Sequence, residues 1–412
     1  MWFNGELFEI FSWLPTKDLY KFSTVCRTFN QLLFEDAFIK KQCKNMQLVG
    51  DTHFFLHHVR NFSRKVEFHA ISSNNSNVLS GDGAGLYGYE PKHQLLPHAS
   101  LDFLINKGSI LASSNGLLCC KNVNDNEDLL FLFNPTTRSY WPIPTPDETI
   151  NSDKEINLVF AYDHDAEAER SFAYLLMAIV VPTEWGAPFR CKVYSPKQNI
   201  WREGGKINTG ERNLCLQYSF KHNGVIYMIS DTGKYLTKDS PFYWPYVVAY
   251  DIKNSCSKFL KLPMEAWEEA GYLCLDLRIF KWGPNPNSAL NSICLVKLLD
   301  NVFTVWVLNT TTNVEENNTY SYYWSQVFYM PIIGMGLSSL LDDVKVTGFT
   351  VMNGGVLLFA TDKKVYSCDI LGWSDVGRVE EVCGHGFGEN FVNFRPFCGT
   401  LCRCGPAAAT LL

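Results

Sequence analysis

A short unit of apolar strands and turn residues recurs along most of the chain, and it limits the possible fold more than any other feature. Each unit contains a small turn, an apolar strand, a connection, a second apolar strand, a polar turn and an aromatic residue. It is visible in SSNGLLCC…LFLFNPTTRSYWPIP, in KHNGVIYMIS…VVAYDIKNSCSKFLKLP and in VMNGGVLLFA…KVYSCDI. Asn-Gly between two apolar runs is a strong hairpin signal, because both residues tolerate positive φ.

The aromatic residues that close these units are evenly spaced. They are Trp141, Trp201, Phe259 and Trp324, separated by 60, 58 and 65 residues. Four-strand units that end in an aromatic residue are typical of β-propeller blades. Residues 60–400 have room for five or six such blades, and we predict six. We expect a strand from the N-terminal side to complete the last blade around HGFGENFVNFRP, because this pairing removes open sheet edges.

The first 45 residues differ from the rest, because their apolar residues follow helical spacing. The first such set is Leu7, Ile10, Phe11 and Leu14. Pro15 is expected to end this helix and Thr16 to cap a second one that runs to about Leu33. The stretch EDAFIKKQC predicts a short third helix. So few helical residues bury too little apolar surface to be stable alone, so their apolar faces need a partner or the chain's own β region.

The segment GELFEIFSWLPTKDLYKFSTVCRTFNQLLFEDAFIKKQ resembles the F-box motif. The likeness rests on LP, the leucine that follows it, VCR, the next phenylalanine and the closing DAFIK. Family members carry an earlier Leu-Pro, at a place where this chain has Asn4-Gly5. The resemblance implies that the helices bind the SKP-type adaptor of a cullin ubiquitin ligase. It assigns to that interface Leu7, Ile10, Phe11, Leu14, Pro15, Leu19, Phe22, Val25, Cys26 and Phe29.

The β region resembles the kelch-like, F-box-associated propeller of plant F-box proteins, through SSNGLLCC, FNPTTRSYWPIP and VVAYDI. A paired kelch diglycine is clear only at Gly354-Gly355. The resemblance implies a small all-α head followed by an all-β propeller. The expected organisation is an F-box at 1–45, a linker with the first propeller strands at 46–104, a kelch-like propeller at 105–400 and a tail at 401–412. The implied function is that of a non-catalytic substrate-recognition subunit of a SKP-cullin-F-box ligase, which holds a target protein for ubiquitination.

Long connections between the second and third strands of the units are the predicted target-binding face. Asn-Gly turns join first and second strands, and PTTR, SPKQ and IKNS join third and fourth strands, so these tight turns share one end of the blades. The opposite end carries longer connections at 122–128, 182–188 and 231–246. Long loops with Trp and Tyr are common binding sites. The candidates are Trp185, Tyr235, Phe242, Tyr243 and Trp244. The alternative is that these aromatic side chains fold back onto the blades.

Charge and cysteine usage narrow the class of protein. The net charge of −6 gives no support to a nucleic-acid partner. The longest apolar run, Ala173 to Val181, is too short to span a bilayer, and no signal peptide is recognisable. The 14 cysteines are scattered through apolar runs such as GLLCC and SICLV, which favours reduced thiols packed as small hydrophobes. We therefore expect a protein of the cytoplasm or nucleus, without a cofactor or a membrane partner.

No catalytic motif is complete. The G-x-G-x-x-G pattern at 83–88 lies among loop residues, and the D-T-G at Asp231–Gly233 lacks the second carboxylate that an aspartic protease needs. Five possible zinc ligands near the C-terminus are Cys383, His385, Cys398, Cys402 and Cys404. Their spacing fits no zinc module, so we predict no metal and no catalytic residue. The alternative to a receptor is a propeller enzyme or carbohydrate-binding module whose helical head is only a structural cap.

Overall fold

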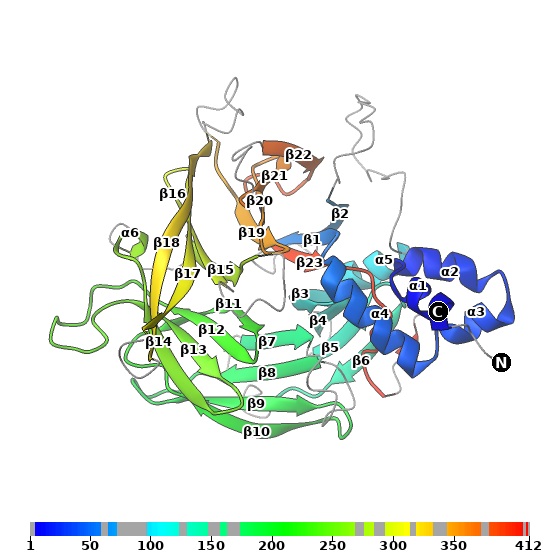
Figure 1. Ribbon diagram of the computed structural model, residues 1–412, viewed down its shortest axis with the longest axis horizontal. Coiled ribbons are helices and arrows are strands. Elements are labelled where there is room, and N and C mark those ends of the chain that lie inside the picture. Colours follow the sequence, from blue (N-terminus) through cyan, green and yellow to red (C-terminus); the bar gives the residue numbers. More distant parts are fainter. Residues whose placement is uncertain are drawn as a thin grey trace. The chain divides into compact units, whose positions relative to one another are not determined.

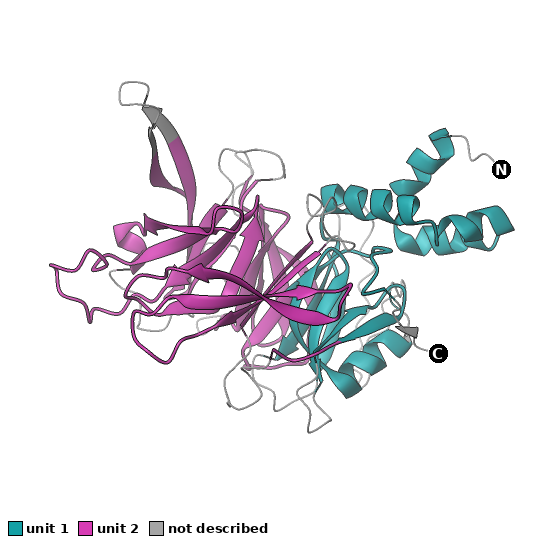
Figure 2. Ribbon diagram, turned by 90° about the horizontal axis from the view of Figure 1, so that it is seen from below, with its two compact units in different colours: residues 1–142, 395–412 teal, residues 143–394 magenta. Residues whose placement is uncertain are grey.

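The chain forms two compact units (Figure 2). The first comprises residues 1–142 and 395–412, so it contains both ends of the chain, and the second comprises residues 143–394. The computed structural model describes residues 5–58, 65–71, 96, 98–122, 130–146, 157–162, 174–267, 276–283, 293–313, 319–332, 344–371, 379–406 and 409–410.

Four helices open the first unit (Figure 1). They are α1 (Gly5–Ser12), α2 (Thr16–Ser23), α3 (Arg27–Leu32) and α4 (Asp36–Val49). The prediction that Thr16 caps the second helix is wrong, because Pro15 occupies the cap position and Thr16 is the first helical residue. The predicted continuous helix to Leu33 is also wrong. The Ser23 and Thr24 hydroxyls bond back to the carbonyls of Tyr20 and Lys21, and the chain then extends before α3 begins.

The third predicted helix is α4, which at 14 residues is longer than the sequence suggested. Its buried residues recur at helical spacing: Phe38, Ile39, Gln42, Cys43, Asn45 and Met46. Gly50 ends the helix with a positive φ of 88°, and its N–H donates to the Met46 carbonyl. The Asn45 amide donates to the Ser12 hydroxyl at 2.7 Å, which ties α4 to α1. The domain boundaries expected at 45, 104 and 400 stay predictions.

Two sheets complete the first unit. The larger contains β3 (Gly108–Ser114), β4 (Leu117–Asn122), β5 (Leu130–Asn134), β6 (Ser139–Ile143) and, on the outer edge beside β6, β24 (Ala409–Thr410). The smaller has the order β2 (Val66–Ala70), β1 (His53–His58), β23 (Val392–Phe397). A strand from the N-terminal side therefore pairs with the HGFGENFVNFRP segment, which confirms that prediction. The sequence analysis missed α5 (His98–Lys107), which packs on β2 and β3.

The second unit consists of four sheets, each an antiparallel meander of four strands. The first contains β7 (Asn157–Tyr162), β8 (Tyr174–Val180), β9 (Phe189–Ser195) and β10 (Ile200–Ile207). The second contains β11 (Leu214–His222), β12 (Val225–Ser230), β13 (Tyr246–Asp251) and β14 (Cys256–Lys261), followed by α6 (Met264–Trp267). The third contains β15 (Leu277–Lys281), β16 (Ile293–Leu299), β17 (Val302–Asn313) and β18 (Thr319–Pro331). The fourth contains β19 (Gly348–Met352), β20 (Val356–Ala360), β21 (Lys364–Asp369) and β22 (Val379–Gly384).

The structure contains six sheets, whose strands follow the short N-terminal helices in the sequence, and this confirms the predicted six-bladed propeller. Within the second unit the first strands are the inner ones, since β11 lies against β7 and β15, and β15 lies against β19. Arg278 of β15 is held there between the rings of Tyr218 and Phe349, at 4.3 and 4.1 Å. Each apolar core of this unit combines side chains from neighbouring sheets, so the hydrophobic core lies between blades.

The turns and closing aromatics follow the predicted pattern. The Asn-Gly turns at 115–116, 223–224 and 353–354 have positive φ at both residues and join first to second strands. The four closing aromatics all lie on fourth strands. Two of them donate a hydrogen bond to a backbone carbonyl of an earlier chain segment. The Trp324 indole donates to the Lys261 carbonyl at 2.8 Å, and the Trp201 indole donates to the Pro144 carbonyl at 2.6 Å. These two closing residues thus join their blades to the chain segment before each blade.

Cysteine chemistry departs from the expectation at one position. Twelve of the described cysteines are free thiols. Cys215 on β11 is disulfide-bonded, so the expectation of reduced thiols is wrong there. In the described part of the chain, no helix has the length and apolar character needed to cross a membrane.

Candidate functional site

The first candidate surface lies on α1–α3. Phe11 of α1 packs against Phe22 of α2 and Phe29 of α3, with ring centroids 5.2 and 4.9 Å apart, and these contacts bring the three helices together. Six of the residues assigned to adaptor binding are exposed around this cluster, and we call them the head surface: Leu7, Ile10, Pro15, Phe22, Val25 and Cys26. Ile10 and Val25 are 58 and 67 % exposed. Apolar side chains gathered in this way are typical of a protein-binding site.

The remaining assigned residues lie deeper. Phe11 and Leu19 are buried, while Leu14 and Phe29 are half-buried. The buried side chains of Phe11 and Leu19 hold the helices that carry the head surface in place. The assignment of all ten residues to the adaptor interface stays a prediction.

The sequence analysis missed three exposed aromatic residues, one on α2 and two in the connections that follow α1 and α3. They are Trp13, Tyr20 and Phe34, and Phe34 is 69 % exposed. None of the three belongs to the apolar stripe that helical spacing predicts, so this spacing alone does not select them. Their aromatic character was the available signal, because large exposed rings on a small helical head are unusual.

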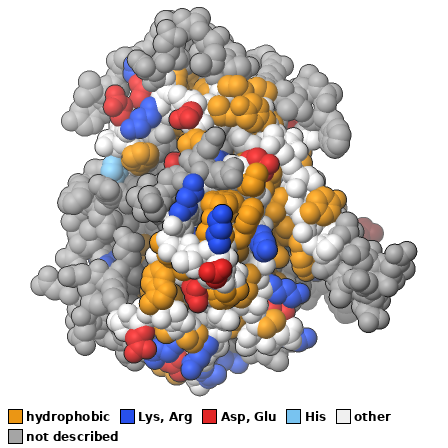
Figure 3. All heavy atoms as spheres, turned by 90° about the vertical axis from the view of Figure 1, so that its left-hand side faces the viewer, with side chains coloured by type: hydrophobic (Ala, Val, Ile, Leu, Met, Phe, Trp, Pro, Cys, Tyr) orange, Lys and Arg blue, Asp and Glu red, His pale blue; other side chains and the backbone are white. Residues whose placement is uncertain are grey.

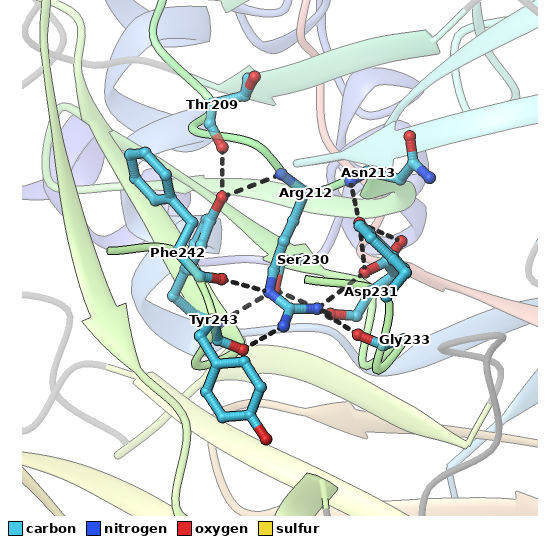
Figure 4. A network of polar contacts seen from close by, with 10 residues as sticks. Thr209, Arg212, Asn213, Ser230, Asp231, Gly233, Phe242 and Tyr243 are labelled. Atoms are coloured by element: carbon cyan, nitrogen blue, oxygen red, sulfur yellow. Dashed lines mark hydrogen bonds and ion pairs between the residues drawn. The ribbon is translucent and has the colours of Figure 1, made fainter. Parts of the chain in front are cut away.

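The second candidate surface belongs to the second unit, and Arg212 organises it (Figure 4). The side chain of Arg212 is only 1 % exposed, and its guanidinium donates to the backbone carbonyls of Phe242, Tyr243 and Gly233. It also donates to the backbone carbonyl and the carboxylate of Asp231, both at 3.3 Å. One buried cation therefore holds both ends of the connection between β12 and β13. Planar guanidinium groups suit this task, since their donors point in several fixed directions.

Tyr235 lies on the outer side of this network. Its hydroxyl donates to the Asp231 carboxylate at 3.0 Å, and its ring lies 5.5 Å from the Arg212 guanidinium carbon. The Asn213 backbone N–H also donates to the Tyr235 oxygen at 3.3 Å. Burial raises the pKa of Tyr235 to about 12, and the nearby Asp231 carboxylate adds to the effect. Tyr235 is consequently a neutral hydrogen-bonding group at physiological pH.

The structure brings two of the predicted binding residues together. The rings of Trp185 and Tyr235 meet edge to face with centroids 5.7 Å apart, although they come from the β8–β9 and β12–β13 connections. Trp185 is 62 % exposed and Tyr235 is 43 % exposed. We call these two residues the aromatic pair. Both connections join second to third strands, as predicted, so the pair stands at the loop end of two neighbouring sheets.

Two of the other three predicted residues, Phe242 and Trp244, pack against the blades, and the assignment of all five residues to target binding stays a prediction. Phe242 packs against Tyr246 and Phe259 in the core between sheets. The Trp244 ring packs against Trp267, and its indole N–H donates to the Leu262 carbonyl at 2.7 Å. The carbonyl of Tyr243 accepts from Arg212, and its side chain is half-buried. The loop at 122–128 falls outside the described residues, except Asn122 at the end of β4.

Charges around the aromatic pair are mixed. Glu184, Lys234, Lys238 and Asp239 are exposed on the same two connections. Figure 3 shows one face of the molecule, on which hydrophobic side chains form separate clusters between basic and acidic ones. A strongly charged ligand is therefore not the partner that this composition favours.

The structure bears on the metal and catalytic motifs that the sequence analysis weighed. Within them, no three His, Cys, Asp or Glu side chains are grouped so that they could hold a metal ion. The D-T-G sequence is a loop after β12 whose carboxylate bonds Arg212 and Tyr235. The G-x-G-x-x-G pattern at 83–88 lies outside the described residues.

Comparisons with known proteins agree with this layout. The F-box-like family matches residues 6–45, and the family described as the F-box associated beta propeller domain matches residues 55–362. F-box/kelch-repeat protein At3g23880 of Arabidopsis thaliana is 23% identical over 367 residues, which cover 87% of this chain and 86% of that protein. F-box protein At5g49610 of the same organism is 22% identical over 286 residues, or 63% of this chain and 64% of the relative's length.

Solved structures resemble the chain only in part. A putative 6-phosphogluconolactonase from Bacteroides uniformis is 11% identical, with a TM-score of 0.37 over 84% of this chain and 99% of that one. Sqt1 from Saccharomyces cerevisiae is 10% identical, with a TM-score of 0.32 over 69% of this chain and 87% of that one. These likenesses are too low to carry an argument about activity.

Proposed function

This chain belongs to the F-box associated β-propeller family, and from that premise we propose that it is the substrate-recognition subunit of a SKP-cullin-F-box ubiquitin ligase. The observation that carries the proposal is the head surface, a set of exposed apolar side chains on the helices that match the F-box. Leaving such a surface in water is unfavourable, at about 25 cal/mol for each Å² of apolar area. A SKP-type adaptor that covers it gains this free energy.

The propeller supplies the second interaction, with a target protein. The aromatic pair is the candidate anchor, because exposed Trp and Tyr side chains frequently dominate the free energy of protein binding. The Arg212 network keeps the Tyr235 ring in place before any partner arrives, which lowers the ordering cost of binding. Mixed charges nearby favour a folded or peptide partner of balanced charge over a polyanion.

The chain contributes proximity and no reacting group. An adaptor-bound cullin ligase carries a ubiquitin-conjugating enzyme, and a target held on the propeller meets that enzyme at a raised effective concentration. The lysine of the target then attacks the ubiquitin thioester on the enzyme. The compartments in which we expect this to occur are the cytoplasm and the nucleus.

Affinity purification of tagged full-length variants tests the two interactions separately. Replacing Leu14-Pro15 by alanines should remove the adaptor from the purified complex while target proteins remain. Trp185→Ala should keep the adaptor and lose targets. The matched control is Tyr329→Ala on β18, since Tyr329 is 61 % exposed and Trp185 is 62 % exposed. Retention of the adaptor by the Leu14-Pro15 variant contradicts the assignment of the head, and equal target recovery by the Trp185 and Tyr329 variants contradicts that of the propeller.

A further inference from the structure

Two buried cysteines from opposite ends of the sequence meet in the first unit. The sulfur atoms of Cys43 on α4 and Cys402 in the C-terminal tail are 2.6 Å apart, although the residues are separated by 359 positions. Both side chains are buried, with exposed fractions of 2 and 5 %. A disulfide bond is about 2.05 Å long, so the two sulfur atoms need to approach by only about half an ångström to be bonded.

Contacts on both sides of this pair hold α4 against the tail. The Leu401 backbone N–H donates to the Gln42 side-chain oxygen at 3.1 Å. The Arg403 guanidinium lies 2.8 Å from the Asp36 carboxylate and also donates to the Phe34 carbonyl at 3.1 Å. The residues immediately before and after Cys402 are bonded to α4 and its N-terminal side, so the position of Cys402 beside Cys43 is fixed by its neighbours.

The tail is in turn bound to the β3–β6 sheet. The buried Asn134 amide donates to the carbonyls of Thr400 and Cys402, at 3.0 and 2.8 Å. The Thr400 hydroxyl donates to the Asn115 carbonyl at 2.8 Å, and the Asn115 amide donates to the Cys43 carbonyl at 3.0 Å. The tail thus lies between α4 and the sheet and is bonded to both.

We propose that Cys43 and Cys402 are an oxidation site, at which a peroxide or a small disulfide converts the two thiols into a bond between α4 and the C-terminal tail. The tail is hydrogen-bonded to the β3–β6 sheet, so this bond locks the helices that carry the head surface onto the first unit's sheet. The proposal concerns the chain's own chemistry and does not depend on adaptor or target binding.

Oxidation by hydrogen peroxide balances in two steps. The Cys402 sulfur attacks one peroxide oxygen, the O–O bond breaks, and a sulfenic acid and one water form. The Cys43 sulfur then attacks the sulfenic sulfur, the S–S bond forms, and a second water leaves. The Asn115 amide donates to the Cys402 sulfur at 3.7 Å, so a hydrogen-bond donor lies beside the atom that attacks the peroxide.

Burial makes the reaction slow and selective. It raises the pKa of the Cys43 thiol well above its usual value, and the neighbouring Cys402 adds to this, so the Cys43 thiolate is rare while the tail is in place. The other tail thiols have different partners, since Cys398 donates to the Asn115 side chain and Cys404 to the Ser139 carbonyl. Cys43 and Cys402 are both free thiols, and their sulfur atoms already lie 2.6 Å apart.

The full-length protein, treated with hydrogen peroxide under native conditions, tests the proposal. After blocking of free thiols and non-reducing digestion, mass spectrometry should find the Cys43–Cys402 peptide at least tenfold more abundant than any other new cysteine pair. The oxidised chain should also migrate faster on a non-reducing denaturing gel, because a loop of 359 positions is closed, and dithiothreitol should reverse the shift.

Variants supply the control. Cys43→Ser should abolish both signals, whereas Cys294→Ser, which removes an equally buried thiol on β16, should leave them unchanged. The wild-type digest decides the question even where a variant folds poorly. The proposal is overturned if exposed Cys26 and Cys256 become oxidised in the wild-type protein and no Cys43–Cys402 peptide appears, or if the gel shift survives in Cys43→Ser.

Discussion

Arg212 is the residue on which the candidate target-binding face most depends. Its guanidinium satisfies carbonyl groups at both ends of the β12–β13 connection and pairs with Asp231, whose side chain is 14 % exposed. Removing one partner of such a buried network leaves the others desolvated and unpaired, which costs more than the bonds themselves contribute.

Arg212→Ala should therefore lower the free energy of unfolding by about 3 kcal/mol or more. Urea denaturation followed by tryptophan fluorescence measures the change. Arg202→Ala is the matched control, because Arg202 is exposed and donates to the Gln198 side chain four positions before it. Similar unfolding midpoints for the two variants would mean that the Arg212 contacts contribute little to stability.

Single residues also mark the limit of what the sequence reveals. Nothing in the sequence distinguished the five aromatic residues of the two long connections. In the structure, Phe242 and Trp244 pack against the core, whereas Trp185 and Tyr235 are exposed. Arg212 in the β10–β11 connection binds the backbone carbonyls of Phe242 and Tyr243, about 30 positions further along the chain. Residue type and spacing carry no information about such a long-range contact.

At the scale of elements, the Asn-Gly turns offer a controlled comparison. Gly116 and Gly224 occupy equivalent turns with φ of 81° and 76°. A Cβ at Gly116 would meet the Thr400 hydroxyl and the Cys398 carbonyl of the tail, whereas a Cβ at Gly224 would meet nothing within 4 Å.

Both Gly→Ala variants should lose about 1 kcal/mol from positive-φ strain. Gly116→Ala should lose clearly more, because the tail must also move. Thermal unfolding of both variants measures the difference, and limited proteolysis reports whether the tail is released. Equal destabilisation would show that the tail yields without cost and does not clamp this turn.

Two of the three histidines of β1, His53 and His57, make the first unit sensitive to acid. Burial lowers the pKa of His53 to about 4 and that of His57 to about 3, and the Arg395 charge assists at His57. In the unfolded chain both rings take up a proton near pH 6.5, whereas in the folded protein they stay neutral until pH 4 or below. The unfolded state then binds more protons, so stability is lost as pH falls below 6.5.

At pH 5 each of these histidines should cost about 2 kcal/mol of folding free energy relative to neutral pH. Urea midpoints at pH 7.5 and pH 5 measure the loss. His57→Gln should reduce it, and His69→Gln on the neighbouring strand β2 is the comparison variant. A loss of stability at pH 5 that is the same in His57→Gln and the wild type would rule out this origin.

Elements were predictable where the signal was local. The Asn-Gly turns, the closing aromatics on fourth strands and the partner strand for the last blade all follow from turn chemistry and strand alternation. The break between α2 and α3 was missed, because Ser23 and Thr24 end the helix by side-chain bonds to its own carbonyls, which a pattern of apolar residues does not register. The helix α5 was missed because its apolar stripe is weak.

For the whole molecule, the joined chain ends have the widest consequence. The C-terminal tail binds both α4 and the β3–β6 sheet. Within the first unit, residues more than 350 positions away therefore connect α4 to this sheet. No local pattern in the sequence predicts this joint.

The central claim is that the head surface binds a SKP-type adaptor, and calorimetric titration of the purified full-length chain with that adaptor tests it most directly. The double variant Ile10→Glu, Val25→Glu places charges on two strongly exposed apolar positions, and Leu48→Glu places one on an exposed position of α4 outside the head surface. We predict that the double variant raises the dissociation constant at least about tenfold, which corresponds to a loss of about 1.4 kcal/mol of binding free energy. Leu48→Glu should leave the dissociation constant within about twofold of the wild-type value. Unchanged affinity in the double variant, or no binding by the wild-type chain, would contradict the account.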